Sequence, residues 1–375
     1  MVATWLIAAA GLIVGCAESP APPPASIRVS QPLADDDLRN QLDEVLDFTY
    51  HQRYLNTDDH AAWQILHGAL TYKRQFMVRD GGELVSAVDH VLQGGQMRGW
   101  TMRRGVLLDN DTDGQERHGI KAILEEGSKT GQGHADQWLA VLAQCELAPE
   151  QTIELFGDEF TMSDWVAQVQ YDVPNNLQRE YSWTLIGLTT YLPTSAEWTA
   201  ADGATWSIER LVAIEAEQDL GASACGGTHR LIGMSMALNQ HLAEGGKIEG
   251  VWQDADRRIR ETVEITRQYQ NENGGFSSQY FQRPGSSPDL ARTLSTTGHI
   301  LEFLAISLTD EQLREPWVQR AVARLCDVFR KTMQTDLECG ALYHATHGLA
   351  LYRERVYGPR DYSQPRPSEE STAQR

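Results

Sequence analysis

The chain alternates between strongly apolar segments and more polar, amphipathic ones. Apolar residues recur at helical spacing along most of the sequence, and strand signals are scarce. The most apolar segments carry small and aliphatic residues on more than one face, which predicts helices that are surrounded by protein. There are six such segments: 63–76, 134–147, 181–192, 227–242, 297–308 and 343–353.

Amphipathic stretches lie between the apolar segments and are expected to form a second set of helices. In 257–270, for example, charged residues lie on one side of the expected helix, whereas Ile259, Val263 and Thr266 mark the other side. The clearest stretches are 38–54, 161–171, 206–219, 255–270 and 317–333. The segment Arg117 to Glu126 is the expected helical partner before 134–147.

A polar helix, a loop and an apolar helix thus recur about six times, at roughly 50-residue spacing, which is typical of an internal repeat. Each hairpin has an apolar face that it cannot bury alone, and stacking neighbours buries these faces. Closing the stack into a circle leaves no exposed end. The sequence therefore predicts an all-α fold, an (α/α)6 toroid over 35–357, with the apolar helices as its inner wall. The alternative is an open solenoid with capped ends.

One segment carries a family resemblance. Gln270 to Phe276 reads Gln-Asn-Glu-Asn-Gly-Gly-Phe. It is similar to the Gln-x-x-x-Gly-x-Trp repeat of the α/α-toroid superfamily of terpenoid cyclases and protein prenyltransferases, with Phe in place of Trp. Ile265 and Thr266 stand where that family has an aromatic-aliphatic pair. The resemblance implies that Gln270 satisfies a helix terminus and that Phe276 packs on its neighbour. Fold-level resemblance does not transfer an activity.

A histidine recurs near the start of five apolar segments. If all inner helices run the same way, these histidines gather at one mouth of the ring, where the positive helix N-termini disfavour their protonation. Neutral histidines serve as bases, hydrogen-bond partners or metal ligands. We expect the mouth to bind a glycan or an isoprenoid-like ligand through His67, His134, Asp136, His229, His299 and His347. The alternative is structural, because repeats duplicate packing contacts as readily as functional ones.

Metal and catalytic motifs are few. His344 and His347 are close enough to share a helix face, but no third ligand is identifiable. Asp109, Asp111 and Asp113 resemble the start of a calcium loop, although Ile120 stands where the bidentate glutamate belongs. We interpret this segment first as a solvated loop, second as a calcium site and third as the acid of a class II terpene cyclase. Catalytic residues and cofactors stay unassigned, because neither Gly-x-Ser-x-Gly nor His-Glu-x-x-His occurs.

The N-terminal residues predict export. An apolar run over 5–14 is followed by Ile13-Val14-Gly15-Cys16, which resembles a bacterial lipobox. The resemblance implies a signal peptide over 1–15 and a lipid on Cys16. The proline-rich segment 16–34 is expected to be an extended linker, and 358–375 a disordered tail. Ala17, where aspartate would resemble an inner-membrane retention signal, favours the outer membrane.

Composition narrows the partners. The formal net charge is −20, and the basic residues are scattered, which disfavours a nucleic-acid partner. Besides Cys16 there are four cysteines, enough for two disulfides in an oxidising envelope. The predicted protein is a lipid-anchored envelope protein whose mouth binds a small molecule or glycan. The rival prediction is a non-catalytic scaffold whose outer wall contacts partner proteins.

Overall fold

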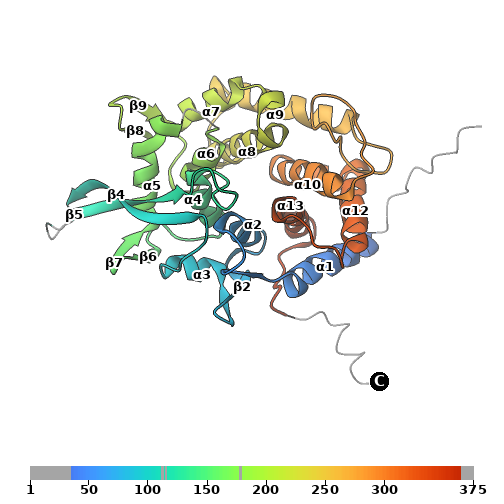
Figure 1. Ribbon diagram of the computed structural model, residues 1–375. Helices are drawn as coiled ribbons and strands as arrows, with labels where there is room; N and C mark the ends of the chain where they lie inside the picture. The colour runs from blue at the N-terminus through green and yellow to red at the C-terminus, as the bar shows by residue number, and fades with distance from the viewer. Residues whose placement is uncertain (1–34, 111–113, 115, 177–179, 365–375) are drawn as a thin grey trace, which may run out of the picture.

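The computed structural model describes residues 35–110, 114, 116–176 and 180–364 (Figure 1). The described chain is mostly helical, with 56% of it in helices, thirteen α-helices and some small sheets. The helical prediction is confirmed at this level, whereas a fold without strands is not. The predicted signal peptide, Cys16 and the linker 16–34 lie outside the described residues. No described helix is both long and apolar enough to cross a membrane.

Six helices form an inner set, which Figure 1 shows towards the middle of the molecule. Each packs against the next along the chain, and the last, α13, packs back against the first, α2. They correspond to the six apolar segments, and α6 shows why these segments lack a polar face, since it is buried at every position over 182–189. The inner helices are α2 (Ala62–Tyr72), α4 (Ala135–Gln144), α6 (Ser182–Tyr191), α8 (Thr228–Ala243), α10 (Leu290–Ser307) and α13 (Cys339–Tyr357).

Six further helices cover the inner set from outside. They are α1 (Asp35–Gln52), α3 (Ala87–Leu92), α5 (Met162–Asp172), α7 (Ile208–Glu217), α9 (Val251–Gln268) and α12 (Pro316–Lys331). The amphipathic stretches predicted from the sequence match five of them. Each packs on at least one inner helix, as α9 does on α8 and α12 on α10. The short helix α11 (Asp310–Leu313) follows α10.

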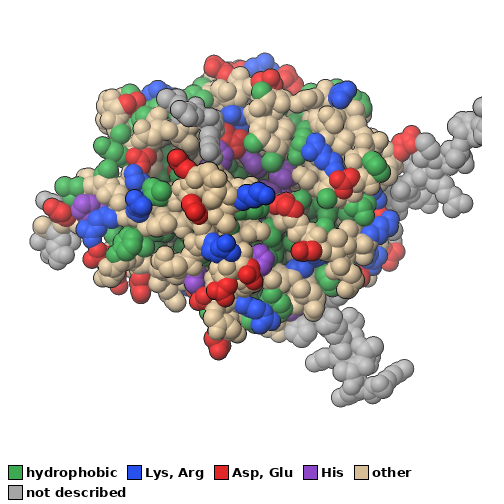
Figure 2. Space-filling view, in the orientation of Figure 1, with side chains coloured by type: hydrophobic (Ala, Val, Ile, Leu, Met, Phe, Trp, Pro, Cys, Tyr) green, Lys and Arg blue, Asp and Glu red, His purple; other side chains and the backbone are tan. Residues whose placement is uncertain are grey.

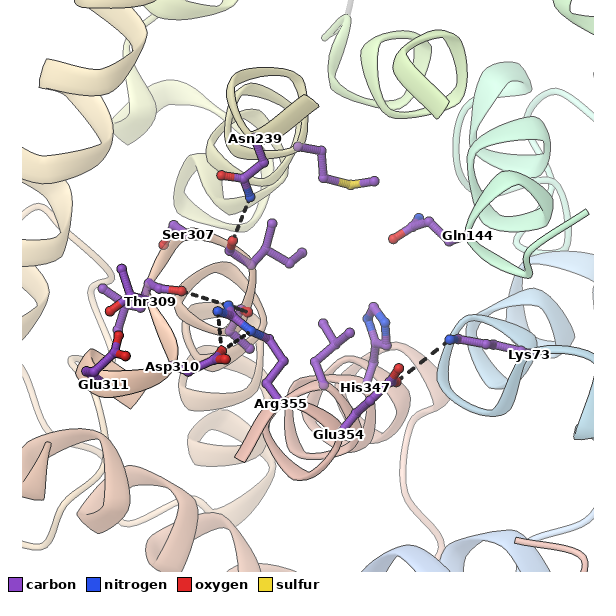
Figure 3. Close-up of a pocket in the computed structure, with 15 residues that line it drawn as sticks. Lys73, Gln144, Asn239, Ser307, Thr309, Asp310, Glu311, His347, Glu354 and Arg355 are labelled. Carbon is purple, nitrogen blue, oxygen red and sulfur yellow. Dashed lines mark hydrogen bonds and ion pairs between the residues drawn. The ribbon is translucent and has the colours of Figure 1, made fainter. Parts of the chain in front are cut away.

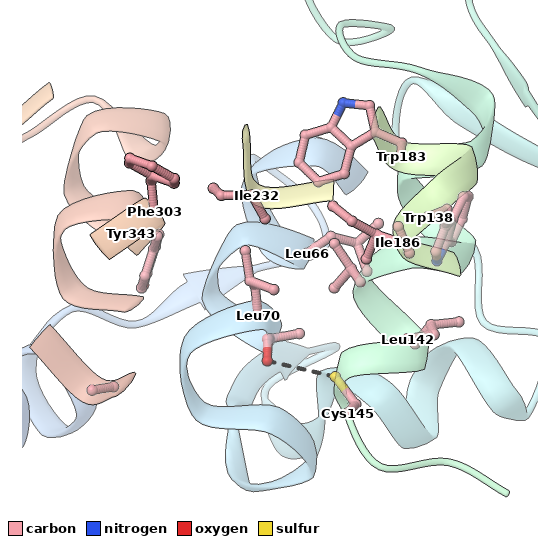
Figure 4. Packing of buried hydrophobic residues seen from close by; sticks show 14 of the residues in the cluster. Leu66, Leu70, Trp138, Leu142, Cys145, Trp183, Ile186, Ile232, Phe303 and Tyr343 are labelled. Atoms are coloured by element: carbon pink, nitrogen blue, oxygen red, sulfur yellow. Dashed lines mark hydrogen bonds between the residues drawn. The ribbon is translucent and has the colours of Figure 1, made fainter. Parts of the chain in front are cut away.

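Side chains from several inner helices meet in one apolar core (Figure 4). Leu66 and Leu70 of α2, Ile186 of α6 and Ile232 of α8 approach one another there, and Trp138 of α4 is almost fully buried beside them. Burial of apolar area is the main favourable contribution to folding. The inner helices are thus held together by packing through the middle of the molecule as well as by their contacts with direct neighbours.

Two glycines let α10 and α13 approach closely. A Cβ atom at Gly298 would lie 2.6 Å from the Cα atom of Ala345, and one at Gly348 would lie 2.9 Å from the backbone nitrogen of Glu302. Only glycine therefore fits these positions without a backbone shift. Because 298 meets 345 and 302 meets 348, the two helices run in the same direction. This close contact brings the Glu302 side chain against α13.

The expected helix Arg117 to Glu126 is wrong, because this segment forms strand β5 (Glu116–Leu124). It pairs antiparallel with β4 (Trp100–Asn110), and the hairpin packs on α5 and α4. Two runs of strand-forming residues on either side of an Asp- and Gly-rich turn predict a β-hairpin. The hairpin forms here in spite of the helical spacing of the apolar residues in the second run. The other strands are β1 (Leu55–Asn56), β2 (Met77–Asp80), β3 (Glu83–Ser86), β6 (Thr152–Leu155), β7 (Asp158–Thr161), β8 (Glu197–Thr199) and β9 (Thr205–Ser207).

Two loop regions also bear on the sequence predictions. Nε2 of Gln270 donates to the carbonyls of Gly274 (2.8 Å) and Trp317 (2.7 Å), at the start of α12, and the ring of Phe276 lies 6.0 Å from that of Trp317.

The predicted disordered tail 358–375 is wrong for 358–364. Tyr362 is buried against α1 and α2, because its ring packs on two tyrosines there.

Candidate functional site

Four imidazole rings meet between the inner helices. They belong to His67 of α2, His229 of α8, His299 of α10 and His344 of α13, and we call them the histidine cluster. His344 is central to it, with ring centroids 3.9 Å from His299, 4.7 Å from His67 and 5.5 Å from His229. All four are buried. Figure 2 shows histidine side chains near the centre of the face seen in Figure 1, next to acidic side chains.

Two buried carboxylates bind the cluster. Glu302 of α10 accepts hydrogen bonds from Nδ1 of His344 (2.7 Å) and Nδ1 of His347 (2.6 Å), one on each oxygen. Glu180, which precedes α6, lies 3.1 Å from Nδ1 of His229 and 3.7 Å from Nε2 of His134. Buried charges need partners of opposite sign, and here each carboxylate lies against two imidazoles.

The hydrogen bonds fix where the protons sit. Nδ1 of His67 must donate to the carbonyl of Trp63, and Nδ1 of His344 must donate to Glu302. Their Nε2 atoms lie 3.1 Å apart, so one of them carries a further proton. Burial, together with the neighbouring His344, lowers the pKa of His67 to about 3. The carboxylate of Glu302 lies against this pair and compensates the charge that the further proton adds.

Cys225 lies near two histidines of the cluster and forms with them a group of possible metal ligands. One atom each of Cys225, His229 and His299 lie within 4.8 Å of one another. Cys225 occupies the turn before α8, where it and the next two residues, Gly226 and Gly227, have φ values of 48°, 66° and 82°. A left-handed conformation is unusual for a residue with a Cβ atom, and such conformations concentrate at functional sites.

The two histidines of this group share an arrangement. Nδ1 of His229 is held by Glu180, and Nδ1 of His299 donates to the carbonyl of Ser295 (2.7 Å). Nε2 of each ring is buried and has no hydrogen-bond partner among the residues that the structure describes. Buried polar atoms are normally satisfied. Both Nε2 atoms are therefore available to a ligand.

The electrostatics of the two histidines differ. Burial disfavours a charge on His229, but the neighbouring Cys225 and Glu180 outweigh it and raise the pKa of His229 well above its ordinary value. Burial and the neighbouring His344 and His229 hold the pKa of His299 well below its ordinary value. His229 is thus the charged ring of this group, with a proton on Nε2 that a metal ion would replace, and His299 is the neutral one.

The prediction that the repeated histidines sit at helix N-termini is wrong for three of them. His134 is the N-cap of α4 and His229 the second residue of α8, but His67, His299 and His347 lie in the middle of their helices. Helices α10 and α13 begin at Leu290 and Cys339, earlier than the apolar runs 297–308 and 343–353. The low pKa values of His67 and His299 arise first from burial, and the expected helix dipole is not their cause.

Asp136 lies away from the histidine cluster. Its carboxylate accepts hydrogen bonds from Thr184 and from Asn176 (3.3 Å), between α4 and α6. Burial raises its pKa to about 6, despite the hydrogen bond from Thr184. The sequence placed Asp136 in the ligand-binding mouth, whereas these contacts indicate a structural role.

We expect Asp136→Asn to stabilise the protein in a pH-dependent way. A carboxyl whose folded pKa is raised from 3.8 to about 6 destabilises the fold as pH rises through that window, by about 3 kcal/mol in total. The variant should therefore be more stable than the wild type at pH 8 and lose this advantage at pH 4, as measured by urea unfolding. The exposed Asp58→Asn is the control. A stability difference that is equal at both pH values would contradict the assignment.

Among the described residues, the aspartate of the calcium-like string and the cysteines form no site with the histidine cluster, apart from Cys225. Asp109 is exposed and forms a bidentate ion pair with Arg117 (2.7 and 2.9 Å), while Asp111 and Asp113 lie outside the described residues. Cys145, Cys225, Cys326 and Cys339 are all free. Sequence reasoning missed the roles of Cys225 and Glu180, because neither stands in a motif with local spacing, and it noted His344 only for its spacing from His347.

Comparison with known proteins gives no match: no family model, no curated protein and no solved structure matches this chain. Its function must therefore be argued from the geometry described above.

Proposed function

We propose that this chain is an (α/α)6 toroid that binds Zn²⁺ at Cys225, His229 and His299. The fold proposal is supported by the closed succession of contacts among the six inner helices. It is also supported by Gln270, whose side chain binds the start of α12 as the cyclase-like repeat implies. The proposed site lies between α8 and α10, two neighbours in that succession.

The observation that carries the metal proposal is the state of the two imidazoles. A metal-bound histidine almost always donates its other ring N–H to a carboxylate or a backbone carbonyl, which orients the ring. His229 has Glu180 in this role, and His299 has the carbonyl of Ser295. Their Nε2 atoms have no hydrogen-bond partner among the described residues, and one ligand atom of each ring lies within 4.8 Å of the Cys225 thiol.

The ligand chemistry favours zinc. Thiolate and imidazole together suit Zn²⁺, whereas Mg²⁺ and Ca²⁺ prefer oxygen ligands. Three protein ligands leave a fourth position open, as in catalytic rather than structural zinc sites. A bound ion would supply a Lewis acid at that position. The predicted glycan or isoprenoid-like ligand would meet the ion there, and the class of that ligand stays a prediction.

A second chemistry uses two of the same residues without a metal. Cys225, His229 and Glu180 follow the order of a nucleophile, a base and an orienting carboxylate. It is favoured by the raised pKa of His229, which arises against burial from the neighbouring Cys225 and Glu180. His299 has no role in this alternative.

The experiment is to load the protein with Co²⁺ and to record the thiolate-to-cobalt charge-transfer band, with total metal measured by mass spectrometry. We expect one ion per chain, and loss of both signals in Cys225→Ser and in His299→Ala. Cys145→Ser and His118→Ala, which alter the same residue types elsewhere, should keep them. Absence of the band in the folded wild-type protein would refute the metal site. Rapid alkylation of Cys225 that persists in His299→Ala would then support the thiol nucleophile.

The cellular part of the proposal is separate. We propose an envelope lipoprotein with its lipid on Cys16, and the support for this is the lipobox-like sequence alone. A non-catalytic scaffold stays the alternative. A scaffold requires no ion at the histidine cluster, so the cobalt experiment separates the two functions as well.

A further inference from the structure

A second cavity lies where the C-terminal ends of inner helices gather. Its volume is about 770 Å³, and it is lined by residues that follow α2, end α4, lie within α8 and α13, and end or follow α10. Figure 3 shows these side chains around a common space. The proposed zinc ligands are not among its lining residues. A cavity of this size accommodates a drug-sized organic molecule.

His347 is the most informative residue in this cavity. It is only 5% exposed, and Figure 3 shows its ring directed into the space. Its Nδ1 donates to Glu302, whose ionised form accepts hydrogen bonds and cannot donate them. Nε2 of His347 therefore carries a lone pair in the neutral ring, and it has no hydrogen-bond partner in the part of the chain that the structure describes. With a neutral His347 ring, the cavity thus presents an acceptor to an N–H or O–H donor.

The charges around the cavity favour a cation. Arg355 is fully engaged, because it binds the carbonyls of Ala305 and Leu308 (both 2.7 Å) and the carboxylate of Asp310 (2.6 Å). Lys73 forms its closer ion pair with Glu146 and reaches Glu354 only at 3.7 Å. Helix C-termini add partial negative charge. Glu354, which Lys73 approaches only at 3.7 Å, is therefore a carboxylate that the charge of a ligand can face.

An apolar part of the wall completes the site. Met236, Ile306 and Leu351 line it beside the polar groups. We propose that this cavity binds an organic ammonium ion with an apolar body, whose N–H group donates to Nε2 of His347 and whose charge faces Glu354. The site is independent of the proposed zinc ligands.

The test uses 4-phenylbutylammonium as the probe, titrated into the full protein and followed by ligand-observed NMR. The matched compounds are 4-phenylbutan-1-ol, 4-phenylbutanoate and the N,N,N-trimethyl form of the probe, which keeps the charge but has no N–H. We expect the probe to bind more tightly than each of the three. Equal binding of the alcohol or of the trimethyl form, tighter binding of the carboxylate, or no binding of the probe would overturn the proposal.

Variants locate the site. Leu351→Trp should fill the cavity and abolish binding, while Glu354→Gln should weaken binding about fivefold, as expected for a partly exposed ion pair. The exposed Glu272→Gln is the charge-matched control and should bind normally. Cys225→Ser should also bind normally, so that failure of the zinc proposal leaves this result unaffected. Unchanged binding in both Leu351→Trp and Glu354→Gln, with folding verified by circular dichroism, would place the probe elsewhere and refute the assignment.

Discussion

Saturating Zn²⁺ is expected to raise the free energy of unfolding of the wild-type protein substantially. A ligand that binds only the folded state stabilises it by about 4 kcal/mol when its free concentration is 1,000 times the dissociation constant. The three ligands come from the turn before α8, from α8 itself and from α10, so the unfolded chain does not hold them together. The measurement is urea unfolding with and without Zn²⁺.

Cys225→Ser should remove most of this stabilisation, because the thiolate is the softest ligand of the proposed set. Cys145→Ser is the matched control, since Cys145 is a buried free cysteine whose thiol only donates to a backbone carbonyl. Glu180→Gln should give an intermediate result, with zinc affinity reduced about 10- to 100-fold through loss of ring orientation. An identical response to Zn²⁺ in Cys225→Ser and in the wild type would rule out the site.

The inner helices were predictable because burial on all sides leaves a strong signal in the sequence. The recurring histidine was a correct indication that distant segments meet, since His67, His229 and His299 do lie in one cluster. Their depth in the structure could not be predicted. Apolar runs mark where a helix is buried, but α10 begins before its apolar run, at a position that only its N-cap, Asp289, indicates. The helix therefore starts earlier, and its histidine lies deeper.

The ligand set itself was beyond sequence reasoning. Cys225 stands next to two glycines, which indicate a turn but give no indication of which side chain the turn presents. Glu180 lies before α6 and reaches His229 only because α6 and α8 pack together. Such contacts depend on the order of helices in space and have no local spacing to reveal them. For the same reason Asp136, adjacent in sequence to His134, was wrongly placed with the histidines.

Glu302 links the two sites. One of its oxygens holds His344, which stacks on the proposed zinc ligand His299, and the other holds His347, which faces the second cavity. The glycines at 298 and 348 permit this arrangement, because they let α10 and α13 approach until a single carboxylate spans both histidines. A change at Glu302 should therefore affect both regions.

Glu302→Gln is expected to lower the free energy of unfolding by about 3–5 kcal/mol at pH 7, the range for removing one partner of a buried ion pair. Glutamine has one acceptor oxygen for two histidine N–H donors, and it leaves the charge of the His67–His344 pair uncompensated. Glu261→Gln, on the exposed side of α9, is the control and should change stability by less than about 0.5 kcal/mol.

The stability difference between the wild type and Glu302→Gln should decrease as the pH falls. Burial alone would raise the pKa of Glu302, but His344 and His347 outweigh burial and hold it well below the ordinary value of 4.5. A carboxylate with a depressed pKa contributes stability that is fully present above 4.5 and is lost as pH falls towards its folded-state pKa. The wild type should therefore lose its advantage over Glu302→Gln on acidification below that value. If the difference in unfolding free energy were the same at pH 7 and at pH 3, Glu302 would not be the ionised partner of these two histidines.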